Sequence, residues 1–232
     1  MDASPFSQAT LESCRAVFNA EIPHYFRHLY TDERSVAPRV EYASGLDTND
    51  PRCAVSIIGC TGDWFGGWDG LERGSVDQFI TADFKGGRLP EVIARGEPAI
   101  MVCHWPGIYF NGEKVGFNIF KQIVERLHAR YDNLIWMKLS EIARYSAART
   151  LTRIDSSGGR VEFRAPFACP AFTFRVPPER RSAVPRFRAD GVERAPFTRV
   201  QQPLDLSAGT WCDTRDGRVI CLDLPRGRSE VV

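Results

Sequence analysis

The sequence predicts an α/β protein, in which a layer of parallel strands covered by helices is followed by a small all-β, sandwich-like module. Between residues 51 and 149, short apolar runs of strand length alternate with amphipathic helical patterns, as in successive strand–helix units. From residue 150 onward lysine is absent, and short alternating segments are separated by turn residues. We therefore predict a helical segment and loop over 1–50, an α/β region over 51–149 and an all-β accessory module over 150–232.

The first region is expected to begin with a helix. Apolar residues recur every three or four positions from Ser7 to about Tyr30, with Pro23 as a break or kink. Residues 31–50 are polar and contain proline and glycine, which favours a loop.

The α/β region contains three runs that predict strands. Residues 53–60 are almost continuously apolar, which is typical of a strand buried on both faces of a parallel sheet. The other predicted strands are 98–103 and 133–137. Helices are expected over 75–81, 89–95, 116–131 and 140–149, the last with Ser140 as its N-cap.

The last region predicts strands joined by short turns. The expected strands are 160–164, 171–176, 198–206 and 219–224, and the expected turns are 156–159 and 213–217.

Charge and cysteine content exclude several classes of protein. The 232 residues carry 30 basic and 29 acidic side chains, a balance that argues against a general nucleic-acid binder. No apolar run approaches the roughly 18 residues that a membrane helix needs, and the N-terminus does not resemble a signal peptide. Seven cysteines without a CxxC pair favour reduced, packed thiols. We predict a cytoplasmic protein that binds neither nucleic acid nor membrane.

Two groups of candidate functional residues follow predicted strands. Ligand-binding side chains of parallel sheets gather just beyond the carboxyl ends of the strands, so the two groups are expected to meet at one edge. Aromatic faces flanked by carboxylates suit sugar rings, and histidine can transfer a proton near neutral pH. The candidates are Asp63, Trp64, Trp68 and Asp69 after the first strand, and His104, Trp105, Tyr109, Asn111 and Glu113 after the second.

Each of these motifs also has a purely structural interpretation. The glycines around Trp64 and Trp68 could simply permit a tight loop, with both indoles packed in the core. His104 could simply form a hydrogen bond with a backbone group. His24 and His28 share a face if the segment is helical and could then hold a metal with a third ligand, although two histidines among aromatics more often pack.

The block from about Arg39 to Tyr145 resembles the carboxyl-terminal half of polysaccharide deacetylase-like (NodB-homology) proteins. Gly62-Asp63-Trp64 is similar to the family's Asp-Trp motif, Val102-Cys103-His104 to the late strand that ends in a general-acid histidine, and residues 132–145 to the last strand and closing helix. The resemblance implies a partial (β/α) barrel-like layer that removes acyl groups from sugars with a divalent metal, zinc being one candidate. It implies that His104 protonates the leaving group and that Asp63 supports it. The family's Asp-Asp pair has no counterpart after an apolar strand here, so the water-activating base stays unnamed.

Three functions follow as expectations. The first is a carbohydrate-active, deacetylase-like hydrolase, complete or an inactive fragment. The second is a non-catalytic carbohydrate-binding protein that uses the same indoles. The third is an assembly subunit that pairs with a partner chain or another copy through an open sheet edge.

Overall fold

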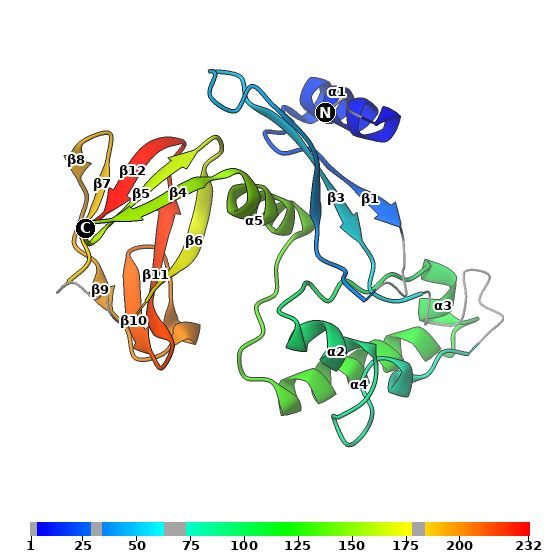
Figure 1. Cartoon of the computed structure of the whole chain (residues 1–232). Helices are drawn as coiled ribbons and strands as arrows, with labels where there is room; N and C mark the ends of the chain where they lie inside the picture. Colours follow the sequence, from blue (N-terminus) through cyan, green and yellow to red (C-terminus); the bar gives the residue numbers. More distant parts are fainter. Residues whose placement is uncertain (1–3, 29–33, 63–72, 178–183) are drawn as a thin grey trace. The chain divides into compact units, whose positions relative to one another are not determined.

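The protein combines helices and sheets in two compact units (Figure 1). The computed structural model describes residues 4–28, 34–62, 73–177 and 184–232. One unit comprises Met1–Pro23, Val40–Ala54 and Ala143–Val232, and the other comprises His24–Arg39 and Val55–Ile142. The units are discontinuous in sequence, whereas the predicted regions were consecutive ranges.

The first helix, α1 (Pro5–Phe18), is shorter than predicted. It ends at Asn19, which adopts a left-handed conformation (φ 47°) and donates its backbone N–H to the carbonyl of Arg15 at 3.1 Å. The chain then enters a strand, β1 (His24–His28), within the stretch that was predicted to be helical. The prediction was wrong here because the apolar spacing after Asn19 fits either element.

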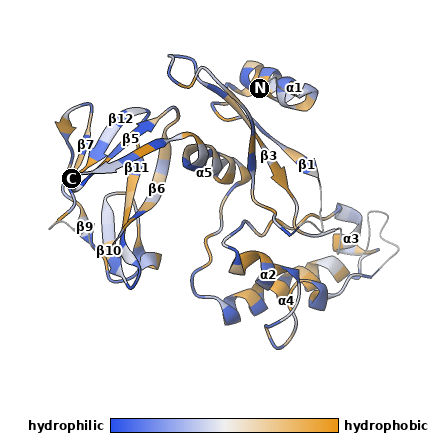
Figure 2. Ribbon diagram, viewed as in Figure 1, coloured by the Kyte–Doolittle hydropathy of each residue, from blue (hydrophilic) through white to orange (hydrophobic). Residues whose placement is uncertain are grey.

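A three-stranded sheet has the order β1-β3-β2, with β2 at Arg39–Ser44 and β3 at Arg52–Ile58. β1 runs parallel to β3, with His24 opposite Val55. Every β3 residue after Arg52 is buried, and Figure 2 shows the hydrophobic colouring of this strand. The buried strand predicted over 53–60 is therefore confirmed.

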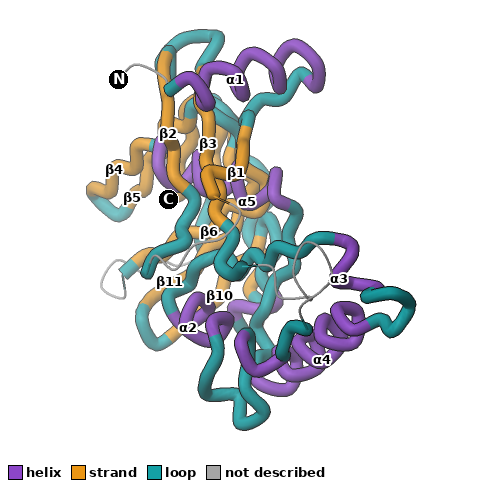
Figure 3. Tube along the Cα trace, turned by 90° about the vertical axis from the view of Figure 1, so that its right-hand side faces the viewer, coloured by secondary structure: helices purple, strands orange, loops and turns teal. Residues whose placement is uncertain are grey.

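The remaining regular elements described in the second unit are helices. The amphipathic helix predicted over 116–131 is confirmed as α4 (Val115–Arg130). It buries Ile119, Ile123 and Leu127 and packs against α3 (Trp105–Tyr109; Figure 3). The short helices predicted over 75–81 and 89–95 are also present. The elements are η1 (Val76–Gln78), α2 (Arg88–Ala94), α3 (Trp105–Tyr109) and α4 (Val115–Arg130).

Two predicted strands are absent. Neither 98–103 nor 133–137 is assigned to a strand. The first keeps one strand-like feature, because Cys60 donates its backbone N–H to the carbonyl of Ile100 at 2.8 Å. The second is exposed, with 77% of Ile135 accessible to solvent. An apolar run of strand length becomes a strand only when a neighbour completes its ladder of hydrogen bonds, and sequence alone does not show that neighbour.

The chain continues into a predominantly β region after α5 (Leu139–Leu151). α5 starts before the predicted cap, so Ser140 lies inside it, and the Glu141 carboxylate instead accepts the backbone N–H of Lys138 at 2.7 Å. A five-stranded sheet has the order β4-β5-β12-β7-β8, and a four-stranded sheet has the order β6-β11-β10-β9. The strands are β4 (Arg153–Ser157), β5 (Arg160–Ala165), β6 (Cys169–Val176), β7 (Phe187–Ala189), β8 (Val192–Glu193), β9 (Thr198–Arg199), β10 (Thr210–Thr214), β11 (Gly217–Leu224) and β12 (Gly227–Val231).

The predicted strands 160–164, 171–176 and 219–224 are confirmed, as are both turns, which join β4 to β5 and β10 to β11. The predicted strand 198–206 is not continuous: β9 covers only its start, and a 3-10 turn, η3 (Pro203–Asp205), follows. Pro203 lacks the N–H that a strand interior uses.

Both β sheets contribute to one hydrophobic core. Phe163 of β5 meets Phe172 and Phe174 of β6 edge to face, with ring centroids 6.3 and 5.0 Å apart. Tyr145 of α5 packs against the same core and donates its hydroxyl to the carbonyl of Thr173 at 3.2 Å. Among the described residues the sheets keep open edges, and none closes into a barrel.

Candidate functional site

The described part of the candidate site is a single segment, residues 104–114, built around α3. His104 occupies the N-cap position of α3 with extended backbone angles, and its side chain is half-buried. Pro106 follows within the first turn, where its fixed φ favours the start of a helix. His104 and Trp105, which were predicted to follow a strand, therefore lie at the N-terminus of α3.

α3 presents two exposed aromatic side chains. Trp105 is 75% exposed and Tyr109 is 57% exposed. They are four residues apart, a spacing that places side chains on the same side of a helix. Large aromatic side chains usually bury most of their surface, so an exposed pair on one helix face indicates a binding surface more than a core.

The turn after α3 has an unusual backbone. Phe110, Asn111 and Lys114 all have positive φ, at 43°, 53° and 58°. The left-handed region is tolerated by asparagine but costs a residue such as phenylalanine about 1–2 kcal/mol. Two backbone N–H groups, from Gly112 and Lys114, converge on the carbonyl of Tyr109 at 3.0 and 2.7 Å and hold the turn in this conformation. This strained turn places Asn111 at the exposed surface.

Arg73 attaches the preceding part of the chain to this turn. Its guanidinium lies 5.2 Å from the centroid of the Phe110 ring and forms an ion pair with Glu113. The sequence analysis placed Glu113 on this loop but missed Arg73, because an isolated arginine in a loop gives no signal that distinguishes it from any other exposed arginine.

The predicted residues Asp63, Trp64, Trp68 and Asp69 lie outside the described residues. The described chain on either side of them is attached to the segment that carries His104. On one side Cys60 bonds the carbonyl of Ile100, and on the other Arg73 contacts Phe110 and Glu113.

A further polar group follows β3 directly. The hydroxyl of Thr61 is buried and has no hydrogen-bond partner among the described residues. Sequence reasoning did not single it out, since a lone threonine after a strand is common.

The two histidines proposed as metal ligands lie on β1, which corrects their expected placement on a helix. Residues four apart in a strand are separated by roughly 13 Å along the chain, whereas zinc–nitrogen bonds are only about 2 Å long. The backbone of β1 therefore does not favour one ion shared by His24 and His28. No group of three or more histidine, cysteine or acidic side chains suited to a metal occurs within the described ranges.

The cysteines are free in the described structure, and five of the seven are buried. Burial raises the pKa of Cys60 to about 11, so its thiol stays protonated near neutral pH. Cys60 is thus a buried, packed side chain two residues beyond β3.

Comparisons with known protein families, with curated proteins and with solved structures gave no match. No helix within the described residues is both long and apolar enough to cross a membrane.

Proposed function

We propose that this protein binds carbohydrate through the exposed aromatic side of α3. The observation that carries the proposal is the pair of indole and phenol rings of Trp105 and Tyr109, exposed four residues apart on one short helix. Such rings offer flat apolar faces on which the C–H face of a sugar ring stacks, while neighbouring polar groups bond its hydroxyls.

Polar groups suited to hydroxyl recognition adjoin these rings. His104 lies at the start of α3, and Asn111 is held at the surface by the left-handed turn. Histidine and asparagine side chains both donate and accept hydrogen bonds, as a sugar hydroxyl requires of its partners. Trp64 and Trp68, which lie outside the described residues, are further candidates for stacking on a sugar ring.

Deacylation of a bound sugar is the second candidate. A half-buried imidazole beside exposed aromatic rings is the observation that favours it, since His104 could protonate a leaving group there, with Asp63 in support. The partial (β/α) barrel-like layer belongs to this candidate. One parallel pair, β1 with β3, supports it, whereas the strands predicted over 98–103 and 133–137 are absent. The extended backbone of β1 does not favour one divalent metal shared by His24 and His28.

Calorimetric titration of the full chain with neutral and N-acetylated oligosaccharides tests the binding proposal. Trp105→Ala is expected to weaken binding by roughly tenfold or more, because central aromatic contacts contribute about 2 kcal/mol. Trp136→Ala is the matched control, since Trp136 is also exposed, at 59%, but lies in the segment after α4. Equal loss in both variants, or no binding by the unmutated chain to any sugar in the panel, would contradict the proposal.

Acetate release from acetylated oligosaccharides tests the catalytic candidate separately. His104→Ala should abolish release, and it should weaken binding less than Trp105→Ala does, because one hydroxyl contact is lost while both aromatic rings remain. Undetectable release by the unmutated protein, or equal release by both, removes the catalytic candidate and leaves the binding proposal intact.

A further inference from the structure

β4 forms an open edge of the five-stranded sheet. Among the described strands it pairs only with β5, and all five of its residues are exposed. The opposite edge, β8, has only two residues. Proteins usually protect an edge of this kind with a proline or a bulge. β4 contains no proline, and its register with β5 is continuous, so its outer side can accept another strand.

The turn after β4 determines which of its backbone groups face outward. Gly158 and Gly159, with φ of 56° and 79°, form a two-residue hairpin turn between Ser157 and Arg160. The residues that flank such a turn bond each other, and bonded and non-bonded pairs then alternate along the ladder. The backbone N–H and C=O of Ile154 therefore point away from β5, toward the open edge.

Ile154 also carries the hydrophobic core to this edge. It lies directly opposite Phe163, which is fully buried, so both side chains are on the core face of the sheet. Ile154 is nevertheless 46% exposed, because no described strand lies beyond β4. A second apolar side chain opposite Ile154 would cover this surface.

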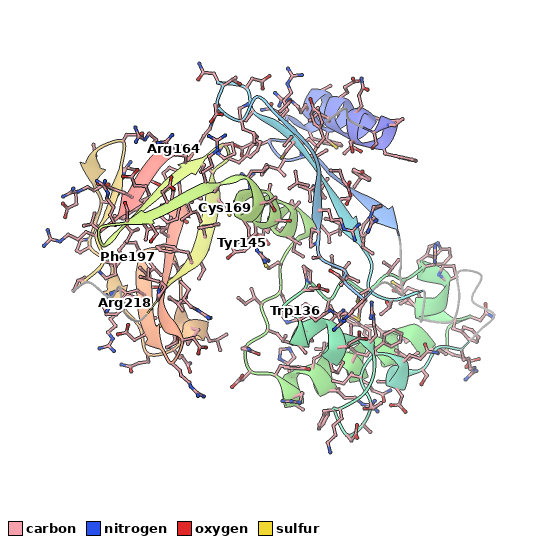
Figure 4. The ribbon with its side chains drawn as sticks, in the orientation of Figure 1. Trp136, Tyr145, Arg164, Cys169, Phe197 and Arg218 are labelled. Carbon is pink, nitrogen blue, oxygen red and sulfur yellow. The ribbon has the colours of Figure 1, made fainter. Side chains whose placement is uncertain are left out.

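The other face of the same strands carries two rows of opposite charge. Residues directly opposite each other form an arginine row and, one position pair further along, an acidic row. The arginine row is Arg153, Arg164 and Arg228, and the acidic row is Asp155, Glu162 and Glu230 (Arg164 is labelled in Figure 4). Both rows reach the open edge, where their end members lie two residues apart on β4.

The end members of the two rows are weakly paired within one chain. Arg153 contacts Asp47 at 3.5 Å, but the two side chains are 65% and 77% exposed, and such ion pairs contribute little. The carboxylate of Asp155 forms no ion pair with any residue that the structure describes. Further along the acidic row, Glu162 contacts Arg160 at 2.8 Å and Arg228 at 3.9 Å.

A second copy of β4, running antiparallel, matches this edge. When Ile154 lies opposite its own copy, Arg153 of each chain lies opposite Asp155 of the other, which is favourable for cross-strand pairs. The arginine row of each chain then continues into the acidic row of the other. The alternative register centred on Asp155 would oppose two carboxylates, which is unfavourable. The charge pattern therefore selects one register.

We propose that β4 is the interface of a homodimer, in which two copies pair antiparallel at Ile154 and their five-stranded sheets become continuous. The edge is complementary to itself in charge, which favours a second copy of this chain over an unrelated strand. A two-fold axis at Ile154 closes the assembly as a dimer. The inference does not rest on sugar binding, because α3 belongs to the other compact unit.

Sedimentation of the full chain over a wide range of concentrations tests the proposal. The mass should rise with concentration from 26.1 kDa to twice that value. Arg153→Asp and Asp155→Arg should each weaken dimerisation by roughly tenfold or more, because each places like charges opposite each other. Arg175→Asp is the matched control, since Arg175 is also exposed, at 58%, but lies on β6 of the other sheet.

Mixing the two single variants distinguishes a direct contact from a loss of folding. In a mixed dimer every arginine at the edge lies opposite an aspartate, so an equimolar mixture should dimerise although neither variant does so alone. The double variant Arg153→Asp, Asp155→Arg should dimerise by itself, because it exchanges the two charges and keeps the register.

The variant Ile154→Pro tests the backbone contact. Proline removes an N–H that points away from β5, so the sheet should keep its β circular dichroism while the dimer is lost.

Four results would overturn the proposal: a monomer at every concentration, equal weakening by Arg175→Asp, no dimer in the mixture or the double variant, or a dimer that persists in Ile154→Pro. Trp105→Ala separates this proposal from sugar binding, because it should weaken binding of neutral sugars without changing the mass of the assembly.

Discussion

Burial of the Cys60 thiol makes the stability of the fold depend on pH in the alkaline range. Cys60 is 1% exposed, and burial raises its pKa from an ordinary value of 9.0 to about 11. Between these values the unfolded chain loses a proton that the folded chain keeps. Stability is therefore fully present below pH 9 and falls as the pH rises toward 11.

The expected slope is about 1.4 kcal/mol per pH unit for one such group. Cys60→Ala should make the decline of stability between pH 9 and 11 less steep, whatever its effect at neutral pH. Chemical denaturation at several pH values measures the slope, with the exposed Cys103 replaced by alanine as the control. An unchanged slope in Cys60→Ala would show that this thiol does not titrate as its burial implies.

At the level of single elements, the junction of β11 with β6 depends on one glycine. Gly217 has φ 136°, and a Cβ atom there would lie 2.4 Å from the carbonyl oxygen of Val176. Gly217→Ala must displace the backbone of a paired strand, so we expect a loss of about 2–4 kcal/mol. Gly209→Ala is the control, because Gly209 also has positive φ (84°) but an added Cβ meets nothing within 4 Å.

Urea denaturation of the two glycine variants measures the difference. Gly209→Ala should lose only the conformational cost, about 1 kcal/mol. Equal losses in both variants would mean that φ, and not the close approach to Val176, determines the effect at Gly217.

Elements with a clear pattern of hydrophobic residues were predictable from the sequence. α4 has apolar residues on one face and was found where expected, as was the continuously apolar β3. β1 was missed because Ile22 and Phe26 fit a helix as well as a strand, and the decisive left-handed turn at Asn19 has no unambiguous signal.

The candidate site was predictable only in part, because its geometry depends on packing between distant segments of the chain. His104, Trp105, Tyr109 and Asn111 were selected by their position after an apolar run, and the structure gathers them around α3. The run itself is not a strand. Exposure of the rings, the left-handed turn and the contact of Arg73 with Phe110 depend on tertiary packing, which a single sequence does not display.

At the scale of the whole molecule, α5 belongs to the core of the β region although it precedes the predicted boundary at residue 150. Ala148 is fully buried in that core, and Tyr145 packs against it with its ring 5.8 Å from Phe172. Among the residues that the structure describes, the buried members of this core all lie between Ala148 and Val231. The residues that build the core are therefore contiguous in sequence once α5 is included.

A fragment of residues 139–232 keeps this core but lacks Met1–Pro23 and Val40–Ala54 of the same compact unit. We expect the core alone to suffice for a cooperative thermal transition. A fragment of residues 150–232 loses Tyr145, its hydrogen bond to Thr173 and the buried Ala148. Removing a large buried aromatic side chain costs about 3–5 kcal/mol, which is much of the stability of a domain this small. Circular dichroism melts of both fragments measure the difference. If the shorter fragment melts at the same temperature as the longer one, α5 is not part of the β domain and the boundary lies at residue 150.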